Sequence, residues 1–296
     1  YKSTVIIIQN LTFVQDKKIL KKVKSMKQVY KMIVLDLDGT LTNSKKVITP
    51  KTKEALIQAQ KKGVRIVLAS GRPTYGIKNL AEELCLNQHH GYILAFNGGK
   101  IIDCSNNETL FEQTLSPELV PTLYNSAMKG GMQILTYQGK GIAATSTEDK
   151  YVKEEAFINK LPITLYSNFL EQIVYPINKC LIVGDPTPLH EVEIQLAKTL
   201  EGKMSVYRSA DYFLECVPLN VDKAQSLAKL LKLTGIKREE IIACGDGYND
   251  LSMICFAGLG VAMANANEDI RIQANYVTLA SNEKDGVAEV VEKFLL

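Results

Sequence analysis

The sequence predicts an α/β protein with a mainly parallel sheet and a second α/β domain inserted into it. From residue 32 onward, short apolar runs such as Ile33-Val34-Leu35 alternate with helical segments, which is typical of a parallel sheet covered by helices. Between about residues 112 and 215, the predicted strands lack the polar tips that end the other strands. The first pattern returns after Asn220, so the middle segment is interpreted as an insertion.

The elements before the insertion follow from local signals. Thr49 and Pro50 are an N-cap and a first-turn proline, and a Lys-Lys-Gly sequence at 61–63 ends the helix that they begin. The predicted order is a strand at 33–35, this helix, a strand at 64–69, a helix to about residue 86 and a strand at 92–96.

The insertion and the segment after it are assigned in the same way. Inside the insertion, strands at 134–137 and 141–145 form a hairpin around Gly139, followed by a strand at 179–183, a helix at 189–200 and strands at 205–208 and 213–217. After it come a helix at 222–233, strands at 240–244, 259–262 and 276–278, and a helix at 287–294. The predicted domains are a basic N-terminal extension outside the fold at 1–31, a core at 32–111 and 216–296, and the insertion at 112–215.

Charge and composition restrict the classes of function. The 296 residues are 46% hydrophobic and 23% charged, as in ordinary globular proteins. Residues 1–31 hold eight Lys and one acidic residue, a net charge of +7, which leaves −4 for the rest. This mildly acidic body is not typical of a nucleic-acid or membrane-binding surface, although a basic targeting or membrane-touching arm is an alternative interpretation of residues 1–31. No apolar run approaches the roughly 20 residues that span a bilayer.

The six Cys occur singly, without metal-binding spacing. Unpaired cysteines in apolar runs favour a reducing compartment, so we expect a cytoplasmic protein.

The first polar cluster, Asp36-Leu37-Asp38-Gly39-Thr40, follows the first predicted strand. Ligands of open α/β sheets bind at the carboxyl ends of the strands. Two carboxylates at this spacing suit a division of labour in which one attacks and the other moves protons. The structural alternative is an acidic turn that caps a helix.

Two further clusters of polar residues are weaker evidence for a functional site when each is taken alone. Ser70, Gly71 and Arg72 follow the next strand, where a hydroxyl and free backbone N–H groups at a helix start can bind an anion. Lys223 lies in the first turn of a helix, where the helix dipole disfavours a cation, and this hints at a nearby anion. A plain Ser N-cap, a surface Arg and a solvated Lys are the structural alternatives.

The fourth cluster is Gly245-Asp246-Gly247-Tyr248-Asn249-Asp250, again at a strand end. The flanking glycines let the backbone come close to a ligand. Together with Asp36 and Asp38, Asp246 and Asp250 form a set of oxygen ligands without His or Cys, which favours Mg²⁺ over zinc.

These motifs, in this order and spacing, resemble the haloacid dehalogenase superfamily, specifically the Cof-type phosphatases of subfamily IIB. The resemblance covers about residues 32–296 and includes Ser70-Gly71-Arg72-Pro73, Asn97-Gly98, Lys223, the stretch from Gly260 to Ala266, and Asp285-Gly286-Val287-Ala288. It implies a Rossmann-like parallel core with a large α/β cap domain inserted after the third core strand.

The resemblance also implies roles for individual residues. Asp36 would be the nucleophile and Asp38 the general acid and base. Asp36, the carbonyl of Asp38 and Asp246 would bind Mg²⁺, with Asp250 as a further ligand or just behind the ligands. Phosphoryl oxygens would be held by Ser70, Gly71 and Lys223, and weaker candidates on the substrate side are Arg72, Asn97 and Asn249.

The predicted function is Mg²⁺-dependent hydrolysis of a small phosphorylated metabolite, with sugar phosphates expected, through an aspartyl-phosphate. A phosphomutase or phosphotransferase is the main alternative, and a non-catalytic phosphate sensor is disfavoured because Asp36 and Asp38 are both present. We expect the cap to contact the leaving group, with candidates at 136–141 and 148–151. No membrane or nucleic-acid partner is predicted, and the sequence specifies no oligomeric state.

Overall fold

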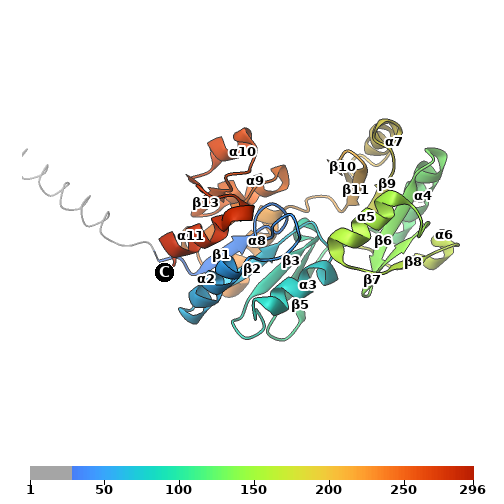
Figure 1. The fold of residues 1–296 in the computed structure, drawn as a ribbon. Helices are drawn as coiled ribbons and strands as arrows, with labels where there is room; N and C mark the ends of the chain where they lie inside the picture. Colours follow the sequence, from blue (N-terminus) through green and yellow to red (C-terminus); the bar gives the residue numbers. More distant parts are fainter. Residues whose placement is uncertain (1–28) are drawn as a thin grey trace, which may run out of the picture.

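A computed structural model describes residues 29–296 and shows two lobes side by side (Figure 1). The predicted extension at 1–31 lies, apart from its last residues, outside the described part of the chain. One lobe is built on an eight-stranded sheet and the other on a six-stranded sheet. Within the described residues, no helix is both long and apolar enough to cross a membrane.

The larger sheet, in the core lobe, is parallel in its centre. Its strand order is β14-β13-β12-β1-β2-β3-β4-β5. The strands are β1 (Met32–Leu35), β2 (Arg65–Ala69), β3 (Tyr92–Ala95), β4 (Lys100–Asp103), β5 (Glu108–Glu112), β12 (Ile241–Gly245), β13 (Leu259–Ala262) and β14 (Tyr276–Val277). Strand β1 pairs in parallel with both β2 and β12. The antiparallel pairs β3–β4 and β4–β5 extend the sheet, and sequence analysis did not predict β4 or β5.

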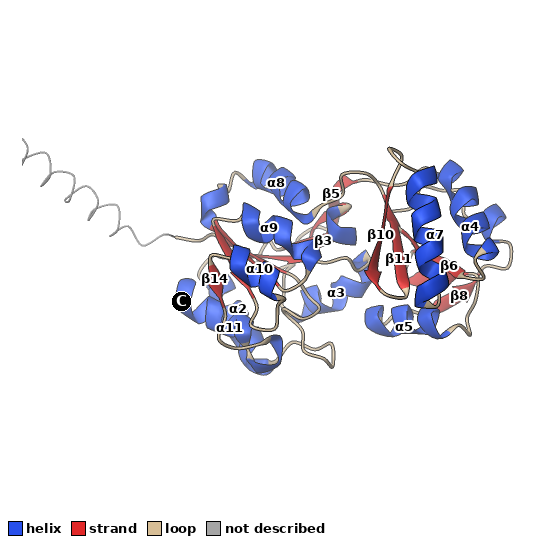
Figure 2. Cartoon of the chain, turned by 90° about the horizontal axis from the view of Figure 1, so that it is seen from above, coloured by secondary structure: helices blue, strands red, loops and turns tan. Residues whose placement is uncertain are grey.

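Helices cover both faces of this sheet. They are α2 (Pro50–Lys61), α3 (Thr74–Glu83), α8 (Lys223–Thr234), α9 (Leu251–Phe256), α10 (Glu268–Gln273) and α11 (Gly286–Phe294). In Figure 2, α8 and α9 lie on one side of the core lobe and α2 and α11 on the other. Side chains of β1 alternate between the faces: Ile33 and Leu35 pack with α2, α3 and α11, whereas Met32 and Val34 pack with α8 and α9. All four are fully buried, as expected of a central parallel strand.

The second sheet lies in the cap lobe, with the order β10-β11-β9-β6-β7-β8. Its strands are β6 (Gln133–Gln138), β7 (Gly141–Ala144), β8 (Ile163–Leu165), β9 (Cys180–Val183), β10 (Ser205–Ala210) and β11 (Phe213–Val217), and its helices are α4 (Val120–Lys129), α5 (Lys150–Asn159), α6 (Phe169–Gln172) and α7 (Pro186–Thr199). Helices α4 and α7 pack on one face and α5 on the other. Strand β11 continues to Val217, past the predicted boundary at residue 215.

The short 3₁₀ helices mark the connections. They are η1 (Phe96–Gly98), η2 (Pro117–Leu119), η3 (Arg238–Glu240), η4 (Tyr248–Asp250) and η5 (Asn282–Lys284). Of these, η1 directly follows β3, and η4 follows β12 after Asp246 and Gly247.

The strand order brings distant motifs to one edge of the core sheet. Asp36 follows β1, Ser70 follows β2 and Asp246 follows β12. Because these three strands are adjacent and parallel, the residues that follow them meet at a common edge. Helix α8 begins there with Lys223, and its N-cap Asp222 accepts a hydrogen bond from the backbone N–H of Gln225.

Candidate active site

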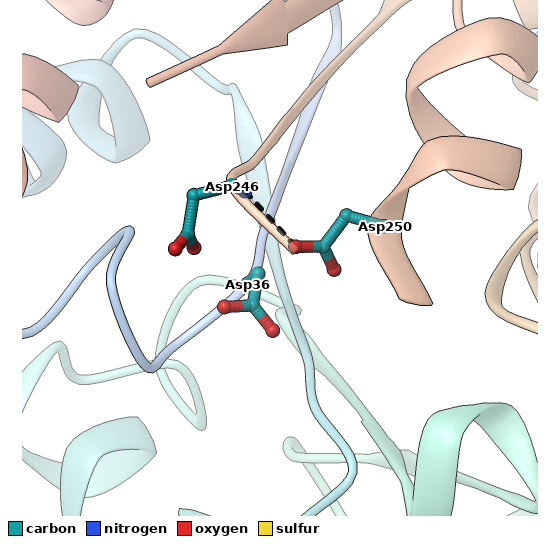
Figure 3. Close-up of side chains that lie close together, drawn as sticks. All are labelled: Asp36, Asp246 and Asp250. Carbon is teal, nitrogen blue, oxygen red and sulfur yellow. Dashed lines mark hydrogen bonds between the residues drawn. The ribbon is translucent and has the colours of Figure 1, made fainter. Parts of the chain in front are cut away.

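Three carboxylates converge at this edge (Figure 3). One oxygen each from Asp36, Asp246 and Asp250 lies within 4.8 Å of the others. Asp36 and Asp250 are buried, and Asp246 is half-buried. Carboxylates crowded in this way repel one another unless cations stand between them.

Lys223 supplies one such cation. Its Nζ lies 2.6 Å from Asp36 Oδ1 and 2.5 Å from Asp250 Oδ1, and the side chain is fully buried. Burial alone would lower the pKa of Lys223, but the carboxylates of Asp250 and Asp36 outweigh it and raise the pKa. The ammonium is therefore permanently charged, and the three carboxylates, when ionised, still leave two negative charges uncompensated.

Burial and this surplus of negative charge both raise the pKa values of carboxyl groups in the cluster. Burial, followed by repulsion from Asp250, raises the pKa of Asp36 well above its usual range despite the nearby Lys223. Burial also raises the pKa of Asp246 to about 6, although the hydroxyl of Thr40 donates a 2.7 Å hydrogen bond to Asp246 Oδ1. A site of this kind is suited to a divalent cation, because such a charge favours the ionised form of every ligand.

Local backbone geometry requires glycine beside the carboxylates. Gly39 has φ = +84°, and a Cβ there would lie 2.1 Å from Asp246 Oδ2. A Cβ on Gly245 would lie 2.4 Å from Asp250 Cβ. Both contacts are closer than real Cβ atoms allow, so the glycines of the two acidic motifs let the chain pass against the carboxylates.

Asp250 also organises the loop that carries Asp246. Its Oδ2 accepts hydrogen bonds from the backbone N–H groups of Asp246 (3.0 Å) and Gly247 (2.9 Å), and the first of these is drawn in Figure 3. With Oδ1 bound to Lys223, Asp250 ties the loop after β12 to the start of α8.

The carboxylate of Asp38 is not part of this cluster and is held by two cationic side chains. Arg72 donates two hydrogen bonds to it, from Nε to Oδ2 at 2.8 Å and from Nη2 to Oδ1 at 2.6 Å. Lys46 Nζ donates another to Oδ1 at 2.6 Å. Burial favours the neutral acid, but the hydrogen bonds and charges of Arg72 and Lys46 prevail and lower the pKa of Asp38.

Ser70 and Arg72 are buried, Gly71 between them is half-buried, and the loop is held at its ends. The N–H of Ser70 donates to the Leu94 carbonyl at 2.9 Å, and the N–H of Arg72 donates to Ser70 Oγ at 3.2 Å. Among the described residues, none accepts a hydrogen bond from the N–H of Gly71, which lies between them. This N–H can bind an anion.

Asn97 and Asn249 lie beside that loop. Asn97 has a left-handed backbone (φ = 55°) in η1, and its Oδ1 accepts a 3.2 Å hydrogen bond from Asn249 Nδ2. A Cβ on Gly71 would lie 3.2 Å from Asn97 Nδ2. The asparagines therefore connect the loops after β2, β3 and β12.

A cavity of about 740 Å³ extends from these loops to the cap. Its core wall includes Asp36, Asp38, Ser70, Gly71, Arg72, Asn97, Lys223, Asn249 and Asp250. Its cap wall includes Glu155 and Asn159 of α5, Tyr207 of β10, Glu215 of β11, and Lys179 just before β9. A cavity of this size suits a small metabolite.

The cap residues expected to contact a leaving group do not line this cavity. No residue of 136–141 or 148–151 contributes to it, so that prediction was wrong. Tyr137 and Gly139 instead line a separate cavity of about 550 Å³, and Glu148 pairs with Lys153 at the surface. The cap side of the cavity is formed instead by α5, β10, β11 and the residue before β9.

Comparisons with known proteins agree with this geometry. A model of the haloacid dehalogenase-like hydrolase family matches residues 33–291. The chain belongs to this family. A haloacid dehalogenase-like hydrolase from Bacteroides thetaiotaomicron is 53% identical, with a TM-score of 0.87 over 89% of this chain and 99% of that one.

Two further members of the haloacid dehalogenase family place the chain more closely. A subclass IIB sugar phosphatase is 26% identical, with a TM-score of 0.73 over 89% of this chain and 98% of that one. A Bacillus subtilis 5-amino-6-(5-phospho-D-ribitylamino)uracil phosphatase is 29% identical over 266 residues, which are 90% of this chain and 96% of the relative. The predicted fold, a parallel α/β core with an inserted cap, and the Cof-type subclass are confirmed.

Several residues of the site carry no sequence signal. Lys46 lies in a loop eight residues after Asp38, and nothing distinguishes it from Lys45 beside it. Lys179 and Glu215 face the cavity from the cap, where an isolated charged residue at a strand end is ordinary. Only the pairing of strands β9 and β11 reveals that the two side chains meet.

Proposed function

We propose that this protein hydrolyses a small phosphomonoester, with a sugar phosphate as the favoured substrate, through an aspartyl-phosphate on Asp36 and with Mg²⁺ as cofactor. The observation that carries the proposal is the cluster of Asp36, Asp246, Asp250 and Lys223 at the end of a cavity. The names of two relatives, a sugar phosphatase and a phosphoribitylamino-uracil phosphatase, support a small phosphorylated substrate.

The residues present fit a hard divalent cation. The cluster offers carboxylate oxygens only, within 4.8 Å of one another, and carries more negative charge than Lys223 compensates. Asp36, Asp246 and the carbonyl of Asp38 would hold Mg²⁺, with Asp250 adjacent. When bound, the cation would offset the charge of the phosphoryl group during transfer.

Asp36 is suited to nucleophilic attack. Its Oδ1 accepts the hydrogen bond from Lys223, whereas Oδ2 has no hydrogen-bond partner among the described residues. Lys223 fixes the carboxylate and reduces its repulsion from an anionic phosphate ester. Attack by Oδ2 on phosphorus forms the acyl phosphate and releases the alcohol. The N–H of Gly71 and the hydroxyl of Ser70 would hold phosphoryl oxygens beside it.

Asp38 is placed to move protons in both half-reactions. Arg72 and Lys46 keep it ionised in this structure. A phosphoryl group bound nearby adds negative charge, and this favours the protonated form that donates to the leaving alkoxide. Once ionised, Asp38 accepts a proton from the water that attacks the aspartyl-phosphate, so one residue serves both steps.

We also place the reaction in the cytoplasm. All six cysteines are unpaired, and four of them, Cys104, Cys180, Cys216 and Cys244, are buried. Burial raises the pKa of these four thiols, so they are unreactive core residues in keeping with a reducing compartment.

A phosphate-release screen tests the proposal. Sugar phosphates, nucleotides and cofactor phosphates are incubated with the protein, with and without Mg²⁺, beside Asp36→Asn. We expect release that requires the metal and is absent in the variant. Release that persists in Asp36→Asn would contradict the aspartyl-phosphate route. An isomerised sugar phosphate with little free phosphate would instead indicate a phosphomutase.

A further inference from the structure

The cap contacts the loops of the candidate active site at two adjacent points. Lys179 Nζ donates a hydrogen bond to the Gly71 carbonyl oxygen at 3.2 Å. Asn97 Nδ2 donates one to the hydroxyl oxygen of Tyr207 at 3.3 Å. Gly71 and Asn97 are packed against each other. The two cap side chains therefore act on one small region of the core, the loop expected to bind phosphate.

Lys179 is bound by the cap on one side and by the core on the other. Its Nζ donates hydrogen bonds to Glu215 Oε1 at 3.3 Å and to the Gly71 carbonyl oxygen at 3.2 Å, and it lies 3.1 Å from Glu215 Oε2, which accepts no hydrogen bond. Lys179 and Glu215 are 4% and 6% exposed. These hydrogen bonds use two of the three N–H donors of the ammonium. A buried ion pair is weak evidence for a contribution to stability, which leaves the contact with Gly71 as the feature to explain.

The orientation of the Gly71 carbonyl affects the groups of the loop that are expected to bind phosphate. Among the described residues, Lys179 is the only hydrogen-bond donor to this oxygen. The same peptide group carries the N–H of Arg72, which donates to Ser70 Oγ. Fixing the carbonyl therefore fixes the Arg72 N–H that orients the hydroxyl of Ser70. The core itself holds the peptide groups on either side, because the N–H of Asn97 donates to the Ser70 carbonyl at 2.8 Å and the N–H of Phe96 donates to the Arg72 carbonyl at 3.0 Å. The Gly71–Arg72 peptide group between them adjoins a glycine, which restricts its own backbone less than any other residue, and its carbonyl is held by Lys179.

We propose that Lys179 is a positioning residue that orients the Ser70–Arg72 loop for phosphoryl binding when the cap lies against the core, with Tyr207 as the second point of contact. This inference rests on the proposed function. The carboxylate of Glu215 holds the ammonium in place, and the ammonium holds the loop. Cap closure and the competence of the phosphate site are thereby coupled through the Ser70–Arg72 loop.

The test removes the contact without leaving an unpaired buried charge. In the double variant Lys179→Met/Glu215→Gln, both charges of the pair are lost together. We expect Mg²⁺-dependent binding of orthovanadate, measured by titration calorimetry, to weaken about tenfold, the range expected for loss of a hydrogen bond from a charged group. We expect kcat/KM to fall by a similar factor for p-nitrophenyl phosphate and for a hexose phosphate. The matched control is Lys150→Met/Asp185→Asn, an exposed cap pair at 3.1 Å.

The comparison of probes separates positioning from substrate recognition. Orthovanadate has no leaving group, so a loss confined to one ester with unchanged orthovanadate binding would overturn the inference, as would no loss at all. If the double variant does not unfold cooperatively, Tyr207→Phe keeps the ion pair and should weaken orthovanadate binding about threefold, and unchanged binding would overturn the inference. A wild-type protein that releases no phosphate contradicts the proposed function instead, whereas weaker orthovanadate binding in the variant still supports the positioning role.

Discussion

The core and the cap both place charged side chains against an α/β sheet, but they do so in different ways. In the core, Asp36 and Asp246 follow the carboxyl ends of β1 and β12, and glycines let the chain pass beside them. In the cap, Lys179 and Glu215 lie on the sheet itself, with Glu155 nearby on α5. The positions of the charged side chains are therefore determined by loops in the core and by strand pairing in the cap.

The two clusters also differ in charge balance. The core has three carboxylates and one ammonium, and the distance among the carboxylates suits an added cation. In the cap, Lys179 pairs with Glu215 while burial raises the pKa of Glu155, so the cluster can become neutral by taking up a proton. We propose that the core cluster requires a divalent cation for its function, whereas the charges of the cap cluster balance without one.

The largest effect is expected at Asp36. Asp36→Asn removes the attacking oxygen, and kcat should fall by at least about 10³-fold, as for other covalent nucleophiles. Phosphate release under saturating substrate measures it. Asp211→Asn, an exposed acidic residue of the cap, is the control and should retain full activity. If the kcat of Asp36→Asn stayed within tenfold of the wild-type value, the assignment of Asp36 as the nucleophile would be contradicted.

The next largest effect is expected at Asp38 and depends on the leaving group. Asp38→Asn should lower kcat about 10²- to 10⁴-fold for an alkyl phosphate, the range for general acid catalysis. The first half-reaction with p-nitrophenyl phosphate should be affected far less, because nitrophenolate leaves without a proton. Pre-steady-state release of nitrophenol measures this step. Equal losses of that step for both esters would contradict the proton-donor role.

Substituting one positive-φ glycine in each lobe, Gly39 in the core and Gly202 in the cap, compares the two lobes directly. In Gly39→Ala, the new Cβ would lie 2.1 Å from Asp246 Oδ2 at φ = +84°, so we expect a loss of about 1–3 kcal/mol in stability together with weaker Mg²⁺ binding. Gly202 of the cap also has positive φ (+71°), but nothing lies within 4 Å of its Cβ position. Gly202→Ala should cost about 1 kcal/mol and leave Mg²⁺ binding unchanged. Denaturant unfolding and metal titration measure both effects.

The smallest expected effect is on stability against pH in the metal-free protein. The pKa of Asp246 rises from 3.8 to about 6 on folding, so the unfolded chain loses this proton first. Through Asp246, stability should therefore fall as pH rises between these two values. Asp36, whose pKa is also raised, adds a fall in the same direction. Asp246→Asn should flatten this part of the profile and be more stable than wild type at neutral pH in EDTA.

Adding Mg²⁺ provides the control for that profile. The free energy of unfolding of the wild type should rise as the Mg²⁺ concentration exceeds its Kd. The rise should be much smaller for Asp246→Asn. Thermal unfolding at several pH values, with EDTA or Mg²⁺, measures both. Stability of the metal-free wild type that rises with pH, with no difference from the variant, would contradict the charge surplus in the core.

The same difference between the lobes explains what the sequence could predict. Asp36, Asp246 and Gly39 were predicted because strand, acidic residue and glycine are contiguous in the chain. The antiparallel strand β4 was missed because its short apolar run follows β3 after only a tight turn. Lys46, Lys179 and Glu215 were missed because their partners are distant in sequence, and no local pattern encodes such pairings. Asp38 was assigned as the general acid and base from its place beside Asp36 in the motif, but its contacts with Arg72 and Lys46 could be found only in the fold.

Trapping the acyl phosphate shows directly whether the phosphoryl group passes through Asp36. Asp38→Asn is mixed with p-nitrophenyl phosphate and Mg²⁺, quenched in acid and digested for mass spectrometry. We predict a hydroxylamine-labile phosphoryl group on the peptide that contains Asp36, because attack proceeds with this leaving group while hydrolysis lacks its base. Stoichiometric nitrophenol release with no phosphoryl group on Asp36, or with the group on another residue, would contradict the account.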